Sequence, residues 1–314
     1  MKVGDPGARC APGIGIEVKV TDRCNQHCFH CVNRDAGASG MQVDHRLVIA
    51  RLREWGRSTH PGRPHIEDVR LTGGEPLLNV EGVADIVRCC SDLGLRSGIN
   101  TNGSLITREV AGSLRLAGMS VMKISLDAVT EEVQVLTRGS SDSLATCLKG
   151  IAVAVEAGFE VIARFTLSRL NGNQLLPCYR FARDAGVAKF QVKPLIDAGR
   201  AAGCGQFLEK GEIRSLLARL AEQAECRRTV PEILCWPPDD AFGLQAKACG
   251  SINKIYVATD GRVTTCNFLR PTWEQDLSMH SLEEIVRDRT AKVLPRNHCG
   301  FRILDGCPHY FEAV

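Results

Sequence analysis

The chain has 314 residues, of which 44% are hydrophobic and 24% charged, and its formal net charge is +3. This composition excludes a disordered or fibrous protein, and the length suits one large α/β domain with or without a small appendage. The small charge and the lack of a long run of Lys and Arg argue against nucleic-acid and membrane partners. We therefore expect a small molecule or a peptide as substrate.

The first residues, MKVGDPGARCAPG, lack the apolar segment of a signal peptide, and the sequence nowhere contains eighteen consecutive apolar residues. These features predict a cytoplasmic protein. Its fifteen cysteines are an odd number, and in a reducing compartment metal ligation explains clustered cysteines better than disulfide bonds do. Dispersed cysteines among apolar helix residues are instead predicted to be small buried hydrophobes: Cys89, Cys90, Cys147, Cys178 and Cys226.

Strand-like and helix-like segments alternate along the first part of the chain. Runs rich in β-branched residues predict six strands, at residues 14–21, 68–74, 96–103, 121–128, 160–167 and 189–195. Helical periodicity follows each of the first five strands, at residues 44–55, 79–93, 107–116, 143–157 and 173–185. Short connections and nearly continuous apolar strands indicate parallel βαβ units, with the strands buried on both faces. Glycine follows four of these helices, as a left-handed C-cap requires: Gly94, Gly118, Gly158 and Gly186.

Six such units do not complete an eight-stranded barrel, so the predicted fold class is α/β, a partial (β/α)6 TIM-like barrel. In parallel architectures of this kind, functional residues gather at the carboxyl ends of the strands. The polar segments TDRCNQHC, TGGEP, NTNG and SLDA all fall at such ends.

The pattern changes after residue 205. A helix is predicted near residues 211–225, and residues 253–266 read as a β-hairpin around an Asp-Gly turn. We expect a barrel at residues 1–205, a linker helix region at 206–248 and a small β-hairpin/α subdomain at 249–314.

Three cysteines occur within the eight residues CNQHCFHC: Cys24, Cys28 and Cys31. A structural zinc site would need a fourth ligand, which His27 or His30 could supply, although paired Cys-x-x-Cys repeats are missing. The alternative is a four-iron cluster with one iron left free for a substrate or cofactor.

This spacing, with the ring of His30 before the last cysteine, resembles the cluster motif of the radical S-adenosylmethionine (SAM) superfamily. The resemblance implies a [4Fe-4S] cluster that binds SAM at its open iron. It also implies reductive cleavage of SAM to a 5′-deoxyadenosyl radical, which abstracts a hydrogen atom. An external one-electron reductant such as flavodoxin or ferredoxin is then the expected partner.

The resemblance extends to the neighbouring strand ends. In TGGEP it implies that Gly73, Gly74, Glu75 and Pro76 hold the SAM amino group, with the carboxylate balancing the ammonium. The alternative is a plain turn with an acidic residue at a helix N-terminus. Further SAM-binding positions implied by the resemblance come from the third and fourth strands and from the cluster motif: Asn102, Ser125, Asp127 and His30.

Two arginines are candidates for SAM contacts with open alternatives. Arg164 interrupts an apolar strand, where it pairs either with the SAM carboxylate or in a structural ion pair. Arg138 lies where relatives often carry an arginine, and a solvated residue at a helix start is the alternative.

The later cysteines resemble an extension of the same superfamily. Cys249 and Cys266 flank the predicted hairpin as in SPASM and twitch extensions, and Cys299 and Cys307 complete a set of four. The resemblance implies one auxiliary [4Fe-4S] cluster, as in the shorter twitch form, and about eight irons in total. Cys235 could replace one ligand, and a four-cysteine zinc site is the alternative.

Compact twitch proteins resemble oxidoreductases that act on sugars, aminocyclitols and nucleosides in antibiotic biosynthesis. We expect hydrogen abstraction from such a substrate, with alcohol dehydrogenation as the outcome and epimerisation or decarboxylation as alternatives. Lys193 and Asp197 are candidate bases or substrate anchors, and Cys235, Cys10 or Cys204 is a candidate hydrogen donor. Peptide maturation and a non-catalytic iron–sulfur protein remain the other hypotheses, although only 23 residues precede Cys24 for peptide recognition.

Overall fold

The computed structural model describes residues 13–32, 40–60, 63, 65–224, 229–234, 241–247, 254–265 and 273–293. In these residues one sheet of eleven strands has the order β11-β10-β9-β1-β2-β3-β4-β5-β6-β7-β8. Its strands are β1 (Ile14–Thr21), β2 (Ile66–Gly73), β3 (Arg96–Thr101), β4 (Val121–Ser125), β5 (Glu160–Leu167), β6 (Lys189–Pro194), β7 (Val230–Leu234), β8 (Gln245–Lys247), β9 (Lys254–Val257), β10 (Arg262–Thr264) and β11 (Glu274–Asp276).

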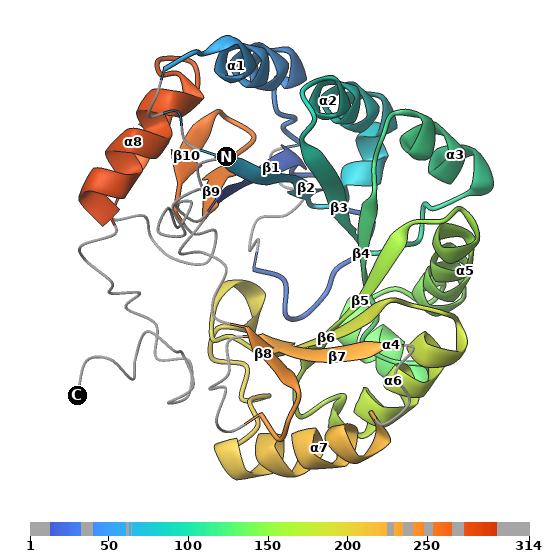
Figure 1. The fold of residues 1–314 in the computed structure, drawn as a ribbon. Coiled ribbons are helices and arrows are strands. Elements are labelled where there is room, and N and C mark those ends of the chain that lie inside the picture. Colours follow the sequence, from blue (N-terminus) through green and yellow to red (C-terminus); the bar gives the residue numbers. More distant parts are fainter. Residues whose placement is uncertain are drawn as a thin grey trace, which may run out of the picture.

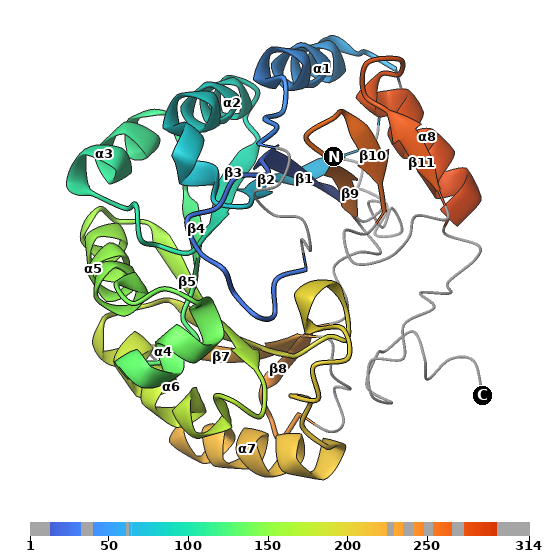
Figure 2. The ribbon, with the colours of Figure 1, turned by 180° about the vertical axis from the view of Figure 1, so that it is seen from behind.

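Helices connect these strands and lie on the outer side of the curved sheet (Figures 1 and 2). They are α1 (His45–Arg57), η1 (Pro76–Asn79), α2 (Val80–Asp92), α3 (Arg108–Leu116), α4 (Glu131–Arg138), α5 (Ser143–Glu156), η2 (Gly172–Gln174), α6 (Leu175–Asp184), η3 (Gly199–Ala201), α7 (Lys210–Gln223) and α8 (Leu282–Val293).

The sheet forms the predicted partial barrel. Neighbouring strands from β1 to β8 pair in parallel, and Figure 1 shows them curving around an open centre. Among the described residues the end strands β8 and β11 pair with one inner neighbour each, so the barrel is not closed. The sequence did not predict β7 and β8, which follow α7 and extend the barrel sheet through the region expected to be a linker. The domain boundaries themselves stay a prediction.

Helix ends agree with the sequence signals. The carboxylate of Asp44 accepts hydrogen bonds from the backbone N–H groups of Arg46 and Leu47 and starts α1. All four glycines predicted to end helices have positive φ angles, from 68° to 99°. Helix α4 was not predicted, because its eight residues are too few for helical periodicity to stand out.

The two faces of the barrel strands differ in chemistry, which corrects one expectation. Their outer residues, such as Val18, Leu71 and Ile124, are buried beneath the helices. Their inner residues alternate with these and are largely polar, for example Arg70 on β2 and Lys123 on β4. The prediction of strands that are apolar on both faces was therefore wrong, because the short strands were read as runs and not by their period of two.

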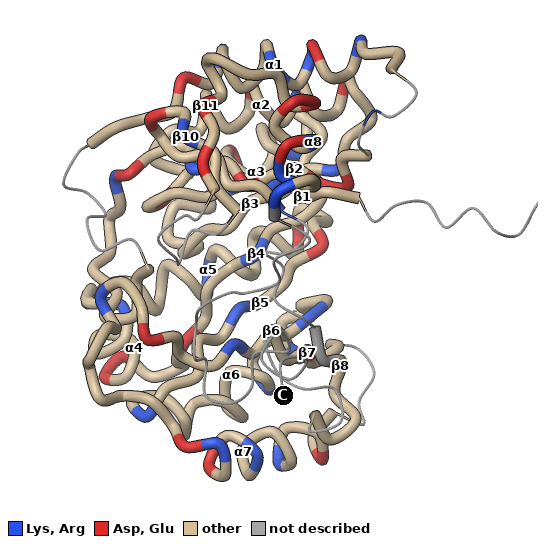
Figure 3. The backbone as a smooth tube through the Cα atoms, turned by 90° about the vertical axis from the view of Figure 1, so that its left-hand side faces the viewer, with Lys and Arg blue, Asp and Glu red and all other residues tan. Residues whose placement is uncertain are grey.

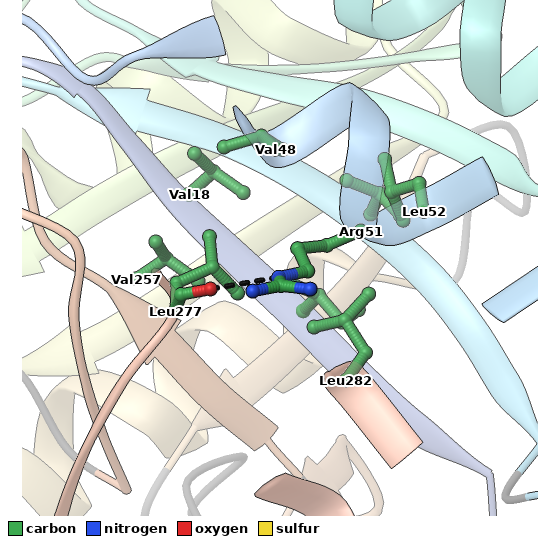
Figure 4. A pocket seen from close by; sticks show the side chains of 9 residues that line it. Val18, Val48, Arg51, Leu52, Val257, Leu277 and Leu282 are labelled. Carbon is green, nitrogen blue, oxygen red and sulfur yellow. Dashed lines mark hydrogen bonds between the residues drawn. The ribbon is translucent and has the colours of Figure 1, made fainter. Parts of the chain in front are cut away.

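The predicted hairpin is confirmed and is joined to the barrel. Strand β9 pairs in parallel with β1 and antiparallel with β10, and Gly261 in the turn has φ 86°. Figure 4 shows how the following segment is attached: Arg51 of α1 donates from Nε to the carbonyl of Leu277, at 2.8 Å. Its Nη2 donates to the carbonyl of Ser278, also at 2.8 Å. Apolar contacts of Val48, Leu52 and Leu282 surround this arginine.

Four of the dispersed cysteines are buried as expected: Cys89, Cys90, Cys147 and Cys178. The fifth, Cys226, lies outside the described residues. Within the described residues, every helix is too short or too polar to cross a membrane.

Candidate active site

A cavity of about 780 Å³ occupies the inside of the barrel. It begins at the carboxyl ends of β1 to β6, here called the mouth, and continues between the strands into the lumen, as we call the barrel interior. The mouth contributes Cys24, Cys28 and Cys31, and the lumen contributes charged strand residues such as Glu17 and Lys123. The sequence predicted that functional residues gather at the carboxyl ends of the strands, and these ends form the mouth, which is one part of a larger cavity.

Residues 22–32, here called the cluster loop, follow β1 and are held by backbone hydrogen bonds. The N–H groups of His27 and Phe29 donate to the carbonyls of Arg138 and Thr137, at 3.1 and 3.2 Å. The carbonyl of Cys31 accepts from the N–H of Arg200 in η3, at 2.8 Å. Elements α4 and η3, from distant parts of the chain, thus fix the conformation of this loop.

The three cysteines of the cluster loop suit a multi-iron cluster better than a single ion. All three line the same cavity and none forms a disulfide bond with another described cysteine. In the described part of the chain, no three His, Cys, Asp or Glu side chains converge as ligands of one metal ion. A tetrahedral zinc ion needs such convergence, whereas in an iron–sulfur cluster each thiolate binds a different iron. Burial raises the pKa of the Cys24 thiol to about 11, so binding of iron must release its proton.

Arg138 is a central part of the site and not a solvated residue. It ends α4, is 6% exposed, and its guanidinium pairs with the fully buried carboxylate of Asp127. Its Nη1 lies 3.6 Å from Sγ of Cys28. Arg138 therefore links a buried ion pair to a predicted iron ligand, which excludes the alternative of a solvated helix-start residue.

Asp127 does not line the cavity, so the expectation that it contacts SAM is not supported by its position. Its Oδ1 accepts from the N–H of Thr166 at 2.8 Å, and its Oδ2 faces Arg138 and, at 3.4 Å, Nε2 of His30. The Asp127 carboxylate thus contacts Thr166, Arg138 and His30 and helps to fix their positions.

His30 lines the cavity, as the resemblance implies. The pKa of its imidazole is lowered to about 4, chiefly by burial and also by the nearby Arg138, while Asp127 opposes this shift. A neutral ring packs edge-on against Phe29, with 5.1 Å between ring centroids. Its Nε2 faces Asp127, and the described residues provide no group of three His, Cys, Asp or Glu side chains for a zinc knuckle.

Glu75 is held by hydrogen bonds within the protein. Its carboxylate is fully buried, outside the residues that line the cavity. Oε1 accepts from the hydroxyl of Thr101 at 2.7 Å and from the N–H of Leu77 at 3.1 Å, and Oε2 accepts from the N–H of Asn102 at 2.8 Å. The carboxylate thus ties the end of β2 to the end of β3. That this carboxylate also balances a SAM ammonium stays a prediction.

Gly73 and Gly74 do line the cavity, but the close approach they permit is to the chain itself. A Cβ on Gly73 would lie 2.6 Å from the carbonyl oxygen of Thr21, and one on Gly74 would overlap the carbonyl of Arg23. The N–H of Gly74 donates to Thr21 at 2.7 Å. Pro76 is buried at the start of η1 and does not face the cavity.

The other expected SAM contacts do face the cavity. Asn102 lines it, and its Nδ2 donates to Oδ1 of Asn25 in the cluster loop, at 2.8 Å. Ser125 and Arg164 lie in register on β4 and β5 and both line the cavity. Three neighbouring strand ends therefore present polar groups beside the three cysteines.

Of the two candidate bases, one lines the cavity and the other does not. Lys193 on β6 lines the cavity. Asp197 is exposed, does not line it, and accepts from the N–H of Gly203 at 2.9 Å. Asp197 therefore closes a turn, which was its alternative interpretation. Cys204 also lies away from the lining residues. The remaining candidate thiols and auxiliary ligands lie outside the described residues: Cys10, Cys235, Cys249, Cys266, Cys299 and Cys307.

Comparison with known proteins agrees with the fold and the cysteine motif. The Radical SAM superfamily model matches residues 18–181. Relatives include the AdoMet-dependent heme synthase of Methanosarcina barkeri, 30% identical over 185 residues that cover 59% of this chain and 51% of the relative. The GTP 3',8-cyclase of Rhodopirellula baltica is 27% identical over 278 residues, covering 81% of this chain and 74% of the relative. The present chain spans about half the length of the first of these proteins.

Among solved structures, Streptococcus suis SuiB bound to S-adenosylmethionine is similar with a TM-score of 0.68. The match covers 87% of this chain and 65% of SuiB at 13% sequence identity, which establishes a shared fold.

Proposed function

Because the chain belongs to the radical SAM superfamily, we propose that this radical SAM enzyme abstracts a hydrogen atom from a small sugar-like, aminocyclitol or nucleoside substrate and oxidises an alcohol. The observation that carries the proposal is the cavity. Its volume of about 780 Å³ lies in the range of small-molecule sites, and it joins the three cysteines to the polar lumen.

Residues at the mouth have separate tasks in this proposal. Cys24, Cys28 and Cys31 hold the iron–sulfur cluster, and Nη1 of Arg138 lies 3.6 Å from Sγ of Cys28. With the cluster, bound SAM supplies the 5′-deoxyadenosyl radical. The SAM contacts are further proposed to come from cavity-lining groups at the neighbouring strand ends: Gly73, Gly74, Asn102, Ser125 and Arg164.

Oxidation of an alcohol removes a hydrogen atom from carbon, a proton from the hydroxyl group and one further electron. Lys193 is our candidate for the proton acceptor, because it lines the cavity close to the mouth on β6. The electron needs an acceptor of the auxiliary-cluster type, for which the proposed ligands are Cys249, Cys266, Cys299 and Cys307.

The relatives favour a small molecule over a peptide. The alignment with a GTP 3',8-cyclase, an enzyme named for a nucleotide, covers 81% of this chain. The likeness to SuiB is at 13% identity and supports the fold alone.

Substrate-dependent formation of 5′-deoxyadenosine tests the proposal. Protein reconstituted with iron and sulfide without oxygen, and then reduced, should cleave SAM slowly alone and faster with a substrate of the proposed class. The product should be two hydrogens lighter than that substrate by mass spectrometry. Stimulation by precursor peptides and not by sugars or nucleosides would favour peptide maturation, and absence of any SAM cleavage would favour a non-catalytic protein.

A further inference from the structure

The lumen contains more positive than negative charge. Nine Lys and Arg side chains line the cavity: Lys19, Arg70, Arg96, Lys123, Arg138, Arg164, Lys189, Lys193 and Lys254. Four carboxylates line it: Glu17, Glu67, Asp68 and Glu160. Such an excess is unusual inside a barrel, because like charges repel and desolvated charges are costly.

The charges at the amino ends of the strands compensate one another. Arg96 pairs with Glu160, and Lys189 lies 3.5 Å from Glu160 and 3.8 Å from Glu232. At the mouth, Arg138 pairs with Asp127. Lys19 pairs with Asp22. Between these two levels, at the middle of the lumen, Lys254 lies 3.5 Å from Glu17 and Arg70 pairs with Asp68, which leaves Lys123 without an ion pair among the described residues.

Lys123 lies at this middle level. It is on β4, two residues and thus about 7 Å before Ser125 at the mouth. It makes no hydrogen bond or ion pair with any described residue, and three cations act on it electrostatically: Arg70, Arg164 and Lys254. Glu17 is the carboxylate that opposes them, and it already lies 3.5 Å from Lys254. Figure 3 shows Lys and Arg positions along β4, β5 and β6.

Arg70 has hydrogen-bond donors without partners, and its guanidinium lies close to Gly98. It is 7% exposed, and its Nη2 donates to Asp68 at 2.7 Å. Its Nε and Nη1 are buried without a hydrogen-bond partner in the described part of the chain. The guanidinium crosses Gly98 on β3, where any Cβ would overlap Nη1. A buried guanidinium with free N–H groups is suited to bind an oxyanion through two of them.

We propose that Lys123 and Arg70, with Lys254 beside them, bind a phosphate or carboxylate group of the substrate. The substrate is then an acidic small molecule whose anionic end lies in the lumen and whose reacting carbon lies at the mouth. This inference rests on the proposed function and narrows its substrate class, because neutral sugars and cationic aminocyclitols offer no anion to Lys123 or to Nε and Nη1 of Arg70. The pKa of the Lys123 amine without a ligand agrees with this proposal. Burial and the neighbouring cations lower this pKa to about 6.

Calorimetric binding to SAM-loaded, reconstituted but unreduced protein tests the proposal without turnover. The probes are glucose, glucose 6-phosphate, gluconate, uridine, uridine 5′-monophosphate and inorganic phosphate. Each acidic probe should bind at least ten-fold more tightly than its neutral partner, and phosphate should compete with it. Comparison of gluconate with glucose 6-phosphate distinguishes a carboxylate from a phosphate. At pH 7.5 binding should take up a proton, because an anion restores the charge on Lys123.

Lys123→Gln should weaken acidic probes at least ten-fold and abolish the proton uptake, with SAM affinity unchanged. Lys292→Gln, which removes an exposed lysine of α8, is the matched control and should change nothing. Equal affinity for neutral and acidic probes, no binding of any acidic probe at millimolar concentration, or full acidic-probe affinity in Lys123→Gln would overturn the proposal. A parallel loss of SAM affinity would also overturn it, because the cations would then hold the SAM carboxylate.

The same preparation, once reduced, separates this inference from the proposed function. Formation of 5′-deoxyadenosine tests the radical chemistry and needs no lumen ligand. Acidic-probe binding without SAM cleavage would contradict the function alone, and SAM cleavage without acidic-probe binding would contradict the inference alone.

Discussion

The mouth and the lumen of the barrel differ in how fully their buried charged groups are partnered by the protein. At the mouth each buried charge has a partner within the protein: Glu75 accepts three hydrogen bonds, and Asp127 pairs with Arg138. In the lumen, Nη2 of Arg70 pairs with Asp68, but its Nε and Nη1 have no hydrogen-bond partner in the described part of the chain, and Lys123 contacts no described carboxylate. The difference indicates that the mouth is rigid before any ligand binds, whereas the lumen is completed electrostatically by what it binds.

The largest expected effect comes from the thiols of the mouth. Replacing Cys24, Cys28 and Cys31 together by alanine should reduce SAM cleavage to background, because no other described thiols line the cavity. Iron content should fall from about eight to about four per chain if the later cysteines hold a second cluster. Cys204→Ala, a half-buried thiol away from the cavity, should keep full iron content. Loss of all iron in the triple variant, or four irons in the parent, would contradict the twitch assignment.

The next effect tests whether the mouth depends on its ion pair. Arg138→Met leaves the carboxylate of Asp127 buried without its cation, which should lower the free energy of unfolding by about 3–5 kcal/mol in urea denaturation. Iron loading should fall too, because Arg138 also contacts Cys28. Arg108→Met breaks the exposed pair with Glu156 and serves as the control, with no measurable change. Equal stability of the two variants would show that the mouth is not held by this pair.

Glycine substitutions test the close packing of the mouth. Gly74→Ala places a Cβ against the carbonyl of Arg23 and should cost about 1–3 kcal/mol of unfolding free energy. Gly112→Ala, in α3 with no heavy atom within 4 Å of the added Cβ, should instead gain about 0.5–1 kcal/mol. Thermal unfolding of both variants compares the two sites directly, and a Gly74→Ala protein as stable as the parent would mean that the cluster loop adapts easily.

The smallest expected effect is the change in unfolding free energy when the buried amine of Lys123 is removed from the lumen. Lys123→Met should raise the free energy of unfolding by about 1–2 kcal/mol near pH 6, the reverse of the usual effect of truncation. The folded pKa of about 6 lies below the ordinary 10.5, so the unfolded chain binds more protons between these values. Stability of the parent therefore rises with pH across this window, and the advantage of Lys123→Met should shrink as the pH approaches 10. A destabilised Lys123→Met protein would show that Lys123 is structural.

Much of the fold could be predicted because its signals are local. Strand β1 follows from a β-branched run, α1 begins at the side chain of Asp44, and Gly94 and Gly158 end helices with positive φ. Helix α4 and strands β7 and β8 were missed, because eight, five and three residues are too short for a periodic pattern. The polar inner face was visible in the sequence as alternation, for example Lys123 with Ser125 and Arg164 with Thr166. Reading strands by their period of two would have found the lumen.

The sequence by itself determined the family motif, Cys24, Cys28 and Cys31, and the order of the βα units, since both depend on neighbours along the chain. Only the tertiary structure decided what each charge does. Glu75 meets Asn102 after the next strand, and Arg138 meets Asp127 and, across 110 residues of sequence, Cys28. The energy of a buried charge depends on the groups within a few ångströms of it, and the folding of distant segments brings those groups together.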